Sequence, residues 1–296
     1  MKKEFLFTYF NIFDKGRRIF RFEFVHNLFH EQIINYLETS YSAVIDKYSE
    51  MNTVNESEIA SKSWTMWWQG ESEMPTIVDI CFQNNKSVLP NLVIITKDNY
   101  REFVDLPNHV IEKFEDGIIG MAQFSDIMRV NLLAKYGGLW IDSTIFLNDK
   151  SVYKYLTNPF WSAKGPDFFK GKYVPKGKWR GFIQYSQKNY IVQQFMVEMF
   201  SEYWKKEKKL VNFFLIDYLY YIAYKHDIGN FKNVIDSIAY LNNNIYKLDE
   251  ELREGKKILL PSDQALIFKL NWKHEYSKSS IEDLDAIVKS RLLERK

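Results

Sequence analysis

The chain has one cysteine, Cys81, among its 296 residues, so no disulfide can form within it. This argues against the small secreted domains that depend on disulfides and predicts a cytoplasmic protein. No apolar run reaches the roughly 18 residues that a membrane-spanning helix needs. The opening MKKEFLFTYFNIFDKGRR has no small-residue cleavage site after its apolar part, and no signal peptide is expected.

Signatures of several other enzyme classes are also missing. No GxGxxG follows the first predicted strand and no GxxxxGK[ST] occurs, so a dinucleotide-binding domain or a P-loop enzyme has no supporting motif. GxSxG and HExxH are absent as well. The formal net charge is only +2, which lacks the basic excess of nucleic-acid-binding proteins. No nucleic-acid partner is expected.

Apolar and aromatic residues are abundant. Hydrophobic residues make up 46% of the chain and charged residues 26%, which allows a full core. Aromatic residues reach 17%. Either this reflects an AT-rich genome, whose codons favour Phe and Tyr, or some of the rings stack on sugars and bases.

Predicted strands alternate with predicted helices in the first half of the chain. WTMWW (64–68) is typical of a strand, and Pro75 opens a helix because the first helical turn tolerates proline. The Val/Ile run at 91–97 indicates a buried strand, and a helix is expected over 107–116, closed by Gly117. This order favours an α/β fold with a mainly parallel central sheet and helices on both faces.

The stretch SDIMRVNLLAKYGGLWIDSTIF (125–146) places a helix, a glycine turn and a strand side by side. Its apolar residues recur at helical spacing until Gly137 and Gly138, which end the helix because glycine takes positive φ without a Cβ clash. The apolar triplet 139–141 predicts a strand buried on both faces. Asp142 follows at its carboxyl end, where open α/β sheets bind ligands.

This segment, SDxxRxxxLxxYGGxWxDxT, resembles the donor site of capsular polysaccharide synthesis glycosyltransferases. These are similar to glycosyltransferase family 32 and, more distantly, to the clostridial glucosylating toxins. The resemblance is strong from Trp64 to Phe146 and looser to Lys273, whereas residues 1–55 match no family that we can name. It implies the nucleotide-diphospho-sugar transferase (GT-A) fold, with a Rossmann-like sheet, and retaining transfer of a hexose from a uridine-diphosphate (UDP) sugar.

The resemblance implies a nucleotide site after the first strand. Trp67 is expected to stack on uracil, because an indole offers a flat π face, whereas Trp68 is more typical of the core. Further contacts of the nucleotide sugar are expected from Gln69, Gly70, Gly138 and Ser143.

The resemblance also implies a divalent ion, Mn²⁺ or Mg²⁺, that an Asp-x-Asp motif holds against the diphosphate. Asp142 supplies the first carboxylate, but Thr144 stands in place of the second, and both are expected on one side of an extended segment. Either a third ligand comes from the C-terminal half, with Asp263 and His274 as candidates, or a cation of the protein takes over part of the charge. The alternative role of Asp263 is to cap a helix that starts after Pro261.

Further charged residues are expected around the sugar. Asp126 and Arg129 form either a surface ion pair, worth about 0–1 kcal/mol, or a catalytic pair that grips sugar hydroxyls, with Asp accepting and Arg donating. Asp217 is a lone carboxylate among apolar residues, and the resemblance implies that it lines the acceptor side in a catalytic role. The alternative is a core acid bonded to tyrosine. A basic loop either closes over the diphosphate or is solvated; its cations are Lys176, Lys178 and Arg180.

Three segments are expected: an N-terminal helical segment (1–60), the GT-A catalytic domain (61–275) and a peripheral C-terminal helix (276–296). The polar stretch 52–63 marks the first boundary. In the first segment, His26 and His30 either hold a metal or simply pack. KGRRIFRF (15–22) either lies on an anionic membrane surface or begins a solvated helix. Further helices are expected over 191–205, 210–225 and after Pro261.

The expected function is that of a nucleotide-sugar-dependent hexosyltransferase in capsular or surface polysaccharide assembly. The acceptor, a lipid-linked oligosaccharide at the cytoplasmic membrane face, is implied by the resemblance alone. One alternative is a catalytically silent sugar-nucleotide-binding subunit, suggested by Thr144. A nucleotidyltransferase is disfavoured, because no glycine-rich basic loop opens the fold.

Overall fold

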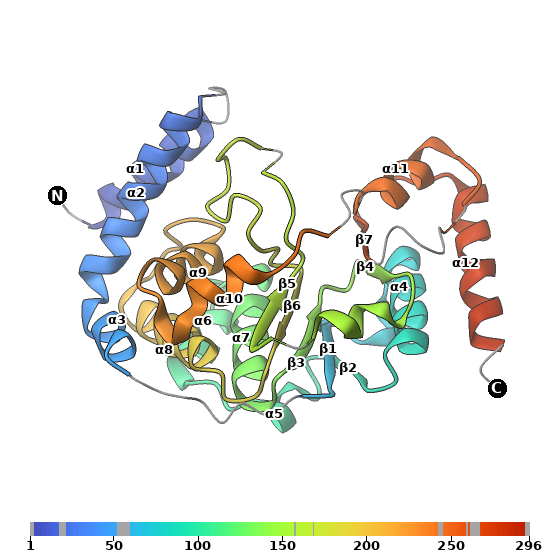
Figure 1. The fold of residues 1–296 in the computed structure, drawn as a ribbon, viewed down its shortest axis with the longest axis horizontal. Coiled ribbons are helices and arrows are strands. Elements are labelled where there is room, and N and C mark those ends of the chain that lie inside the picture. Colours follow the sequence, from blue (N-terminus) through green and yellow to red (C-terminus); the bar gives the residue numbers. More distant parts are fainter. Residues whose placement is uncertain are drawn as a thin grey trace.

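The computed structural model describes residues 3–17, 22–51, 60–156, 158–167, 169–241, 245–258, 260 and 267–293. A central sheet separates two groups of helices (Figure 1). Among the described residues, none of the helices combines the length and the apolar character needed to cross a membrane.

The central sheet consists of β1 (Ser63–Met66), β2 (Leu92–Ile95), β3 (Gly138–Ile141), β5 (Phe160–Ser162) and β6 (Ile183–Ser186). The strand order is β2-β1-β3-β6-β5. β1 pairs in parallel with β2 and β3, whereas β6 is antiparallel to both β3 and β5. Four of the five strands therefore run in one direction, which confirms the expected mainly parallel sheet.

The helix and strand expected from the central stretch are present. α7 (Met121–Tyr136) ends at Gly137, which has a φ of 66°, and β3 begins at Gly138, which has a φ of 101°. A Cβ on Gly138 would lie 2.2 Å from the carbonyl oxygen of Lys62. The close approach of β3 to the chain before β1 therefore requires glycine.

The helices on one side of the sheet share a single core with the N-terminal segment. They are α1 (Lys3–Arg17), α2 (Glu23–Ser40), α3 (Ser42–Ser49), α5 (Tyr100–Phe103), α6 (Asn108–Glu115), α7, α8 (Ile191–Lys206), α9 (Leu215–Lys225) and α10 (Phe231–Ser237). α2 packs on α9, and α3 and α7 pack on α8. Phe29 and Leu37 thus belong to the same hydrophobic cluster as Trp140. The expected boundary after α3 falls mostly on residues 52–59, outside the described residues.

A second, smaller core lies on the other side of the sheet (Figure 1). It is formed by α4 (Thr76–Val88), β4 (Ile145–Leu147), α11 (Lys247–Glu254), β7 (Ile267–Lys269) and α12 (Lys278–Leu293). β4 and β7 form a separate antiparallel pair, and α12 packs on α4 through Leu284 and Val288. The helix expected after Pro75 is confirmed as α4, and the expected C-terminal helix is confirmed as α12.

Some expected elements differ in the structure. The helix expected after Pro261 is wrong for residues 267–269, which form β7 because they pair with β4. The helix expected over 210–225 begins only at Leu215, since the preceding chain turns around Asn212. Short 3₁₀ helices, which were not expected, are η1 (Glu71–Glu73), η2 (Lys150–Tyr155) and η3 (Ile228–Asn230).

Candidate functional site

Asp142 follows the last residue of β3, and its side chain is 36% exposed. Its backbone N–H donates to the carbonyl of Phe182 at 2.9 Å, and the indole Nε1 of Trp140 donates to its Oδ1 at 3.1 Å. The chain then turns, with the N–H of Ile145 bonded to the carbonyl of Asp142. The expected extended geometry for residues 142–144 is therefore wrong, because this turn leads β3 into β4.

Lys269, the last residue of β7, donates hydrogen bonds to both Asp142 and Thr144. Its Nζ donates to Asp142 Oδ2 at 3.2 Å and to Thr144 Oγ1 at 2.7 Å, and it lies over the ring of Phe182. Burial alone would raise the pKa of Asp142, but Lys269 and Arg129, together with the bonds from Trp140 and Lys269, hold that pKa below its usual value. Sequence reasoning missed Lys269, since only the β4–β7 pairing brings it to this corner.

Asp126 and Arg129 form a buried ion pair on α7 rather than a surface pair. Their side chains are 15% and 5% exposed, and Arg129 Nη2 donates to Asp126 Oδ1. The guanidinium also lies 5.6 Å over the ring of Trp140. Its Nε is buried and has no hydrogen-bond partner among the described residues. A buried donor of this kind calls for a ligand or water as its acceptor.

Asp217 lies in the first turn of α9, 9% exposed, and its Oδ1 accepts a hydrogen bond of 2.9 Å from Trp179 Nε1. The alternative of a core acid bonded to tyrosine is therefore wrong, because its partner is an indole. Burial raises the pKa of Asp217 to about 6, while Trp179, Arg129 and Arg180 oppose the rise. Burial also raises the pKa of Asp126, against the pull of Arg129. These charges therefore act on one another within one region.

The two tryptophans after β1 have different surroundings. Trp68 packs against Tyr100 and Phe124 at the main core, which confirms its core role. Trp67 instead makes an edge-on contact with Trp272, with ring centroids 5.9 Å apart. Because β1 and β3 are parallel neighbours, Trp67 follows β1 at the same sheet edge at which Asp142 follows β3.

The turn after β1 is open. Gln69 is exposed. Gly70 has a φ of 97°, and no atom lies within 4 Å of the position a Cβ would take. Ser143, in the turn after β3, is partly exposed. These three residues therefore lie in the loops at the carboxyl ends of β1 and β3.

Of the other expected site residues, Arg180 is brought to this region, whereas Gly138, Lys176 and Lys178 are not. Gly138 lies at the far end of β3, roughly 13 Å along the strand from Asp142 at about 3.3 Å per residue. Lys176 pairs with Glu23 at 3.0 Å, and Lys178 lies over Tyr224, whereas Arg180 acts on Asp217. Asp263 lies outside the described residues.

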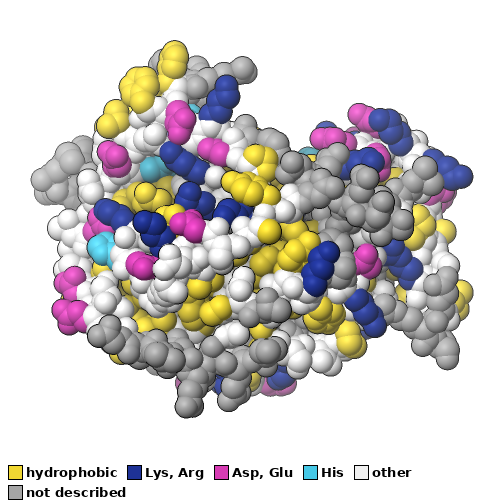
Figure 2. Space-filling view, in the orientation of Figure 1, with side chains coloured by type: hydrophobic (Ala, Val, Ile, Leu, Met, Phe, Trp, Pro, Cys, Tyr) yellow, Lys and Arg dark blue, Asp and Glu magenta, His cyan; other side chains and the backbone are white. Residues whose placement is uncertain are grey.

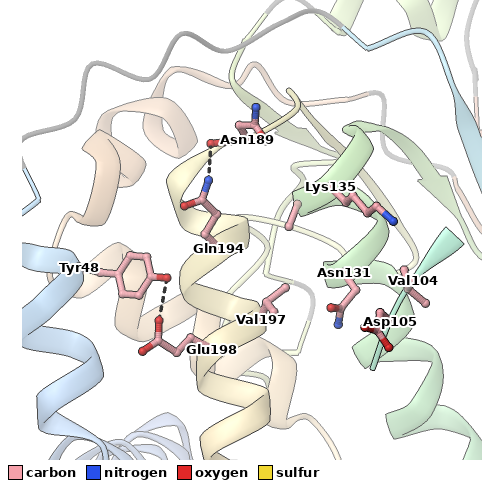
Figure 3. Close-up of a pocket in the computed structure, with 10 residues that line it drawn as sticks. Tyr48, Val104, Asp105, Asn131, Lys135, Asn189, Gln194, Val197 and Glu198 are labelled. Atoms are coloured by element: carbon pink, nitrogen blue, oxygen red, sulfur yellow. Dashed lines mark hydrogen bonds between the residues drawn. The ribbon is translucent and has the colours of Figure 1, made fainter. Parts of the chain in front are cut away.

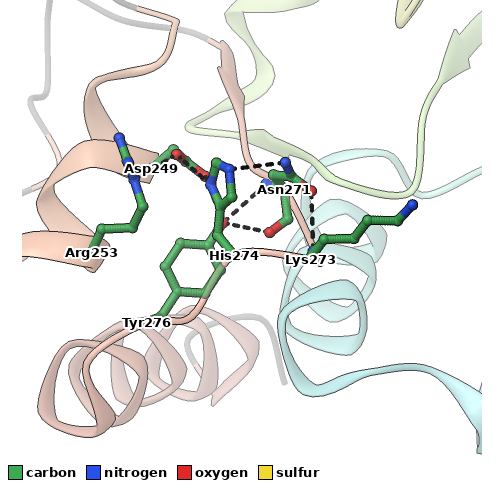
Figure 4. A network of polar contacts seen from close by, with 6 residues as sticks. All are labelled: Asp249, Arg253, Asn271, Lys273, His274 and Tyr276. Carbon is green, nitrogen blue, oxygen red and sulfur yellow. Dashed lines mark hydrogen bonds and ion pairs between the residues drawn. The ribbon is translucent and has the colours of Figure 1, made fainter.

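The histidines considered as metal ligands, His26, His30 and His274, make structural contacts instead. His30 bonds to the hydroxyl of Tyr218 at 2.7 Å and to the carbonyl of Gly171 at 3.0 Å, and His26 is buried, so this pair packs in the interior. His274 Nδ1 donates to the buried Asp249 at 3.0 Å (Figure 4). In the same network Asp249 also accepts from Tyr276 and pairs with Arg253. Through these bonds Asp249 connects α11 to residues 274–276, which lead into α12.

The described residues do not fit the expected divalent-metal site. They contain no group of three or more His, Cys, Asp or Glu arranged to hold an ion. Asp142 and Thr144, the two expected ligands, are both engaged by the ammonium of Lys269. An ammonium group at this point repels a second cation, so the corner as built suits an anion beside Lys269.

A separate surface pocket of about 490 Å³ lies between α3, α7 and α8 (Figure 3). Its α7 residues, Asn131 and Lys135, are on the opposite face of that helix from Asp126 and Arg129. Across it, Tyr48 donates to Glu198 at 2.9 Å. The pocket shares no residue with the cluster around Arg129.

Comparison with known proteins identifies one family. No curated protein and no solved structure matches the chain. The family described as Capsular polysaccharide synthesis protein matches residues 18–288, which include every described element from α2 to β7 and most of α12. The chain belongs to the capsular polysaccharide synthesis protein family.

Proposed function

We propose that the protein is a retaining hexosyltransferase that uses a UDP-sugar and acts in capsular polysaccharide assembly. The family membership supports the pathway. The reaction class is proposed from the resemblance of the central segment to glycosyltransferase family 32. One observation carries the proposal: a buried guanidinium, Arg129, stands among three carboxylates beside the end of β3.

This arrangement suits a sugar ring. Arg129 donates in a planar fork, and Asp126 and Asp217 accept, so together they match the hydroxyl groups of a hexose. Buried acids whose pKa is raised, as in Asp126 and Asp217, occur preferentially at functional sites. In the same arrangement Trp67, beside Trp272, offers an aromatic face to the base.

The acceptor in this proposal is a lipid-linked oligosaccharide, which the protein reaches from the membrane surface. Large apolar side chains are exposed along α1 and α2, with Ile12 67%, Phe22 60% and Phe24 64% exposed (Figure 2). Such residues insert into the headgroup boundary of a bilayer. Phe22→Ser with Phe24→Ser should reduce co-sedimentation with anionic vesicles and leave transfer to a soluble acceptor unchanged. Unaltered co-sedimentation would remove this surface from the proposal.

Transfer and binding assays test the proposed reaction. The purified chain is incubated with a panel of UDP-sugars and an oligosaccharide acceptor, and calorimetry compares UDP with guanosine and adenosine diphosphate. We expect sugar transfer from one donor and tighter binding of UDP. Equal affinity for the three nucleotides, or no binding to any of them, would contradict the assignment.

The alternative is a catalytically silent subunit that binds the sugar nucleotide. Thr144 in place of the second aspartate favours it. UDP binding without turnover on any donor would establish this alternative. Release of pyrophosphate from UTP and a sugar 1-phosphate, without transfer from any UDP-sugar, would indicate a nucleotidyltransferase.

A further inference from the structure

We propose that Lys269 is the cation that binds the donor diphosphate, in the place that a divalent metal takes beside an Asp-x-Asp motif. Its ammonium lies between the two residues that align with that motif, 3.2 Å from Asp142 Oδ2 and 2.7 Å from Thr144 Oγ1. The inference rests on the proposed function, since it concerns the donor of that reaction.

The position of Lys269 is fixed by its strand. In the β4–β7 ladder Lys269 stands opposite Ile145, and its backbone N–H donates to the carbonyl of Ile245 at 2.7 Å. The next N–H, of Leu270, donates to the carbonyl of Thr144. The side chain is 22% exposed, so it is partly open to solvent.

The ammonium keeps a donor for the ligand. It has three N–H groups, of which two bond to Asp142 and Thr144. Within the described part of the chain, no further oxygen accepts from Lys269, whose remaining contact is with the ring of Phe182. The third N–H is therefore available to a phosphate oxygen. Such a charge-assisted bond is among the stronger hydrogen bonds in proteins.

The replacement at Thr144 is consistent with this role. A second carboxylate there would complete a metal site, whereas a hydroxyl accepts from the ammonium and adds no negative charge. The site formed by Asp142, Thr144 and Lys269 then contains one carboxylate and one cation. A diphosphate that binds there contacts an ammonium group whose position is already fixed. A fixed charge of this kind stabilises a leaving group without rearranging during the reaction.

In the reaction the bond between hexose C1 and the β-phosphate oxygen breaks, and its electron pair stays on the phosphate. The acceptor hydroxyl forms the new bond to C1 and passes its proton to the departing phosphate, so that UDP is the leaving group. The Lys269 ammonium donates a hydrogen bond to a β-phosphate oxygen as the negative charge on that oxygen grows.

Calorimetry of UDP binding to the full chain, in EDTA and in MnCl₂, tests the role of Lys269. We expect the wild type to bind UDP equally well in both, and Lys269→Met to lose about ten- to a hundredfold in affinity in both. Lys269→Arg should retain part of the affinity. Lys278→Met, whose side chain is 90% exposed on α12, is the matched control and should bind as the wild type does.

The double variant Lys269→Met/Thr144→Asp extends the test, with melting temperature and near-ultraviolet circular dichroism as folding controls. It should gain Mn²⁺-dependent UDP binding, because it restores two carboxylates and removes the ammonium. UDP binding by the wild type that requires Mn²⁺ and survives Lys269→Met would overturn the role of Lys269 and leave the proposed function standing. No UDP binding under either condition would overturn both.

Discussion

Trp179 and Asp217 form a buried hydrogen bond of 2.9 Å between residues 38 positions apart. Trp179 closes the basic loop that begins at Lys176, and Asp217 lies in the first turn of α9. The loop is therefore attached to α9 at a carboxylate whose pKa is raised by burial and lowered by the charges of Arg129 and Arg180.

Asp217→Asn should stabilise the protein at neutral pH and reduce transfer. The folded pKa of about 6 lies above the usual 3.8, so the folded state binds the proton more tightly than the unfolded state. Stability is therefore lost as pH rises from about 4 to about 6, by about 3 kcal/mol in all. Asparagine keeps an acceptor for Trp179 and removes the charge. Urea unfolding between pH 4 and pH 8 measures this, and an unchanged pH slope in the variant would contradict it.

Arg129→Lys should reduce turnover about ten- to a hundredfold, since hydrogen bonds to charged groups are worth roughly 1.5–3 kcal/mol. Lysine keeps the positive charge but loses the planar fork that also bonds Asp126. Transfer rates together with thermal melting separate the two effects. A wild-type rate would remove Arg129 from the sugar site. Arg101→Lys, on α5, serves as the control for the substitution itself.

Trp67→Ala should weaken UDP binding and should cost less stability than Trp68→Ala, although the half-buried Trp67 ring also packs against the second core. Stacking of a base on an aromatic ring is worth about 1–3 kcal/mol, so the affinity should fall roughly five- to a hundredfold. Trp68→Ala is the contrasting variant: its ring packs on Tyr100 and Phe124, and its removal should cost about 3–5 kcal/mol of stability. If the two substitutions had interchanged effects, the base would lie on the other tryptophan.

Asp249→Ala should destabilise the fold by about 1–3 kcal/mol without affecting UDP affinity, because it removes the acceptor that His274, Tyr276 and Arg253 share. Arg253, 47% exposed on its side chain, is the milder partner, and Arg253→Ala should cost at most about 1 kcal/mol. Chemical unfolding measures both. Equal effects of the two substitutions would show that the network is not organised around Asp249.

Local sequence signals predicted the half of the site that lies on α7 and β3. The helical spacing, the glycine pair and the apolar triplet all act within a few residues, and they place Asp126, Arg129 and Asp142 correctly on their elements. The same signals predicted α4, β2, α6 and α8. Burial of the Asp126–Arg129 pair was left open, because an i, i+3 spacing has the same appearance on a surface.

The other half of the site depends on pairing between distant segments, which no local signal reveals. A strand of three residues, Ile267, Phe268 and Lys269, is too short to show the alternation of apolar and polar residues that predicts a strand. These residues form β7 because they pair with β4. The residues after Pro261 are typical of a helix start, so local propensity predicts a helix where residues 267–269 form a strand. The turn at Ser143 was missed because the resemblance implied an extended motif.

The β4–β7 pairing has a consequence for the order in which the protein matures. On a ribosome Asp142 and Thr144 emerge long before Lys269, so a nascent chain holds the carboxylate without its ammonium. If the diphosphate binds through Lys269, full affinity for the donor is reached only when translation has passed residue 269 and β7 has docked. Incomplete chains would then bind little of the nucleotide sugar in the cell. A chain truncated before residue 267 should bind UDP more weakly than the full chain does.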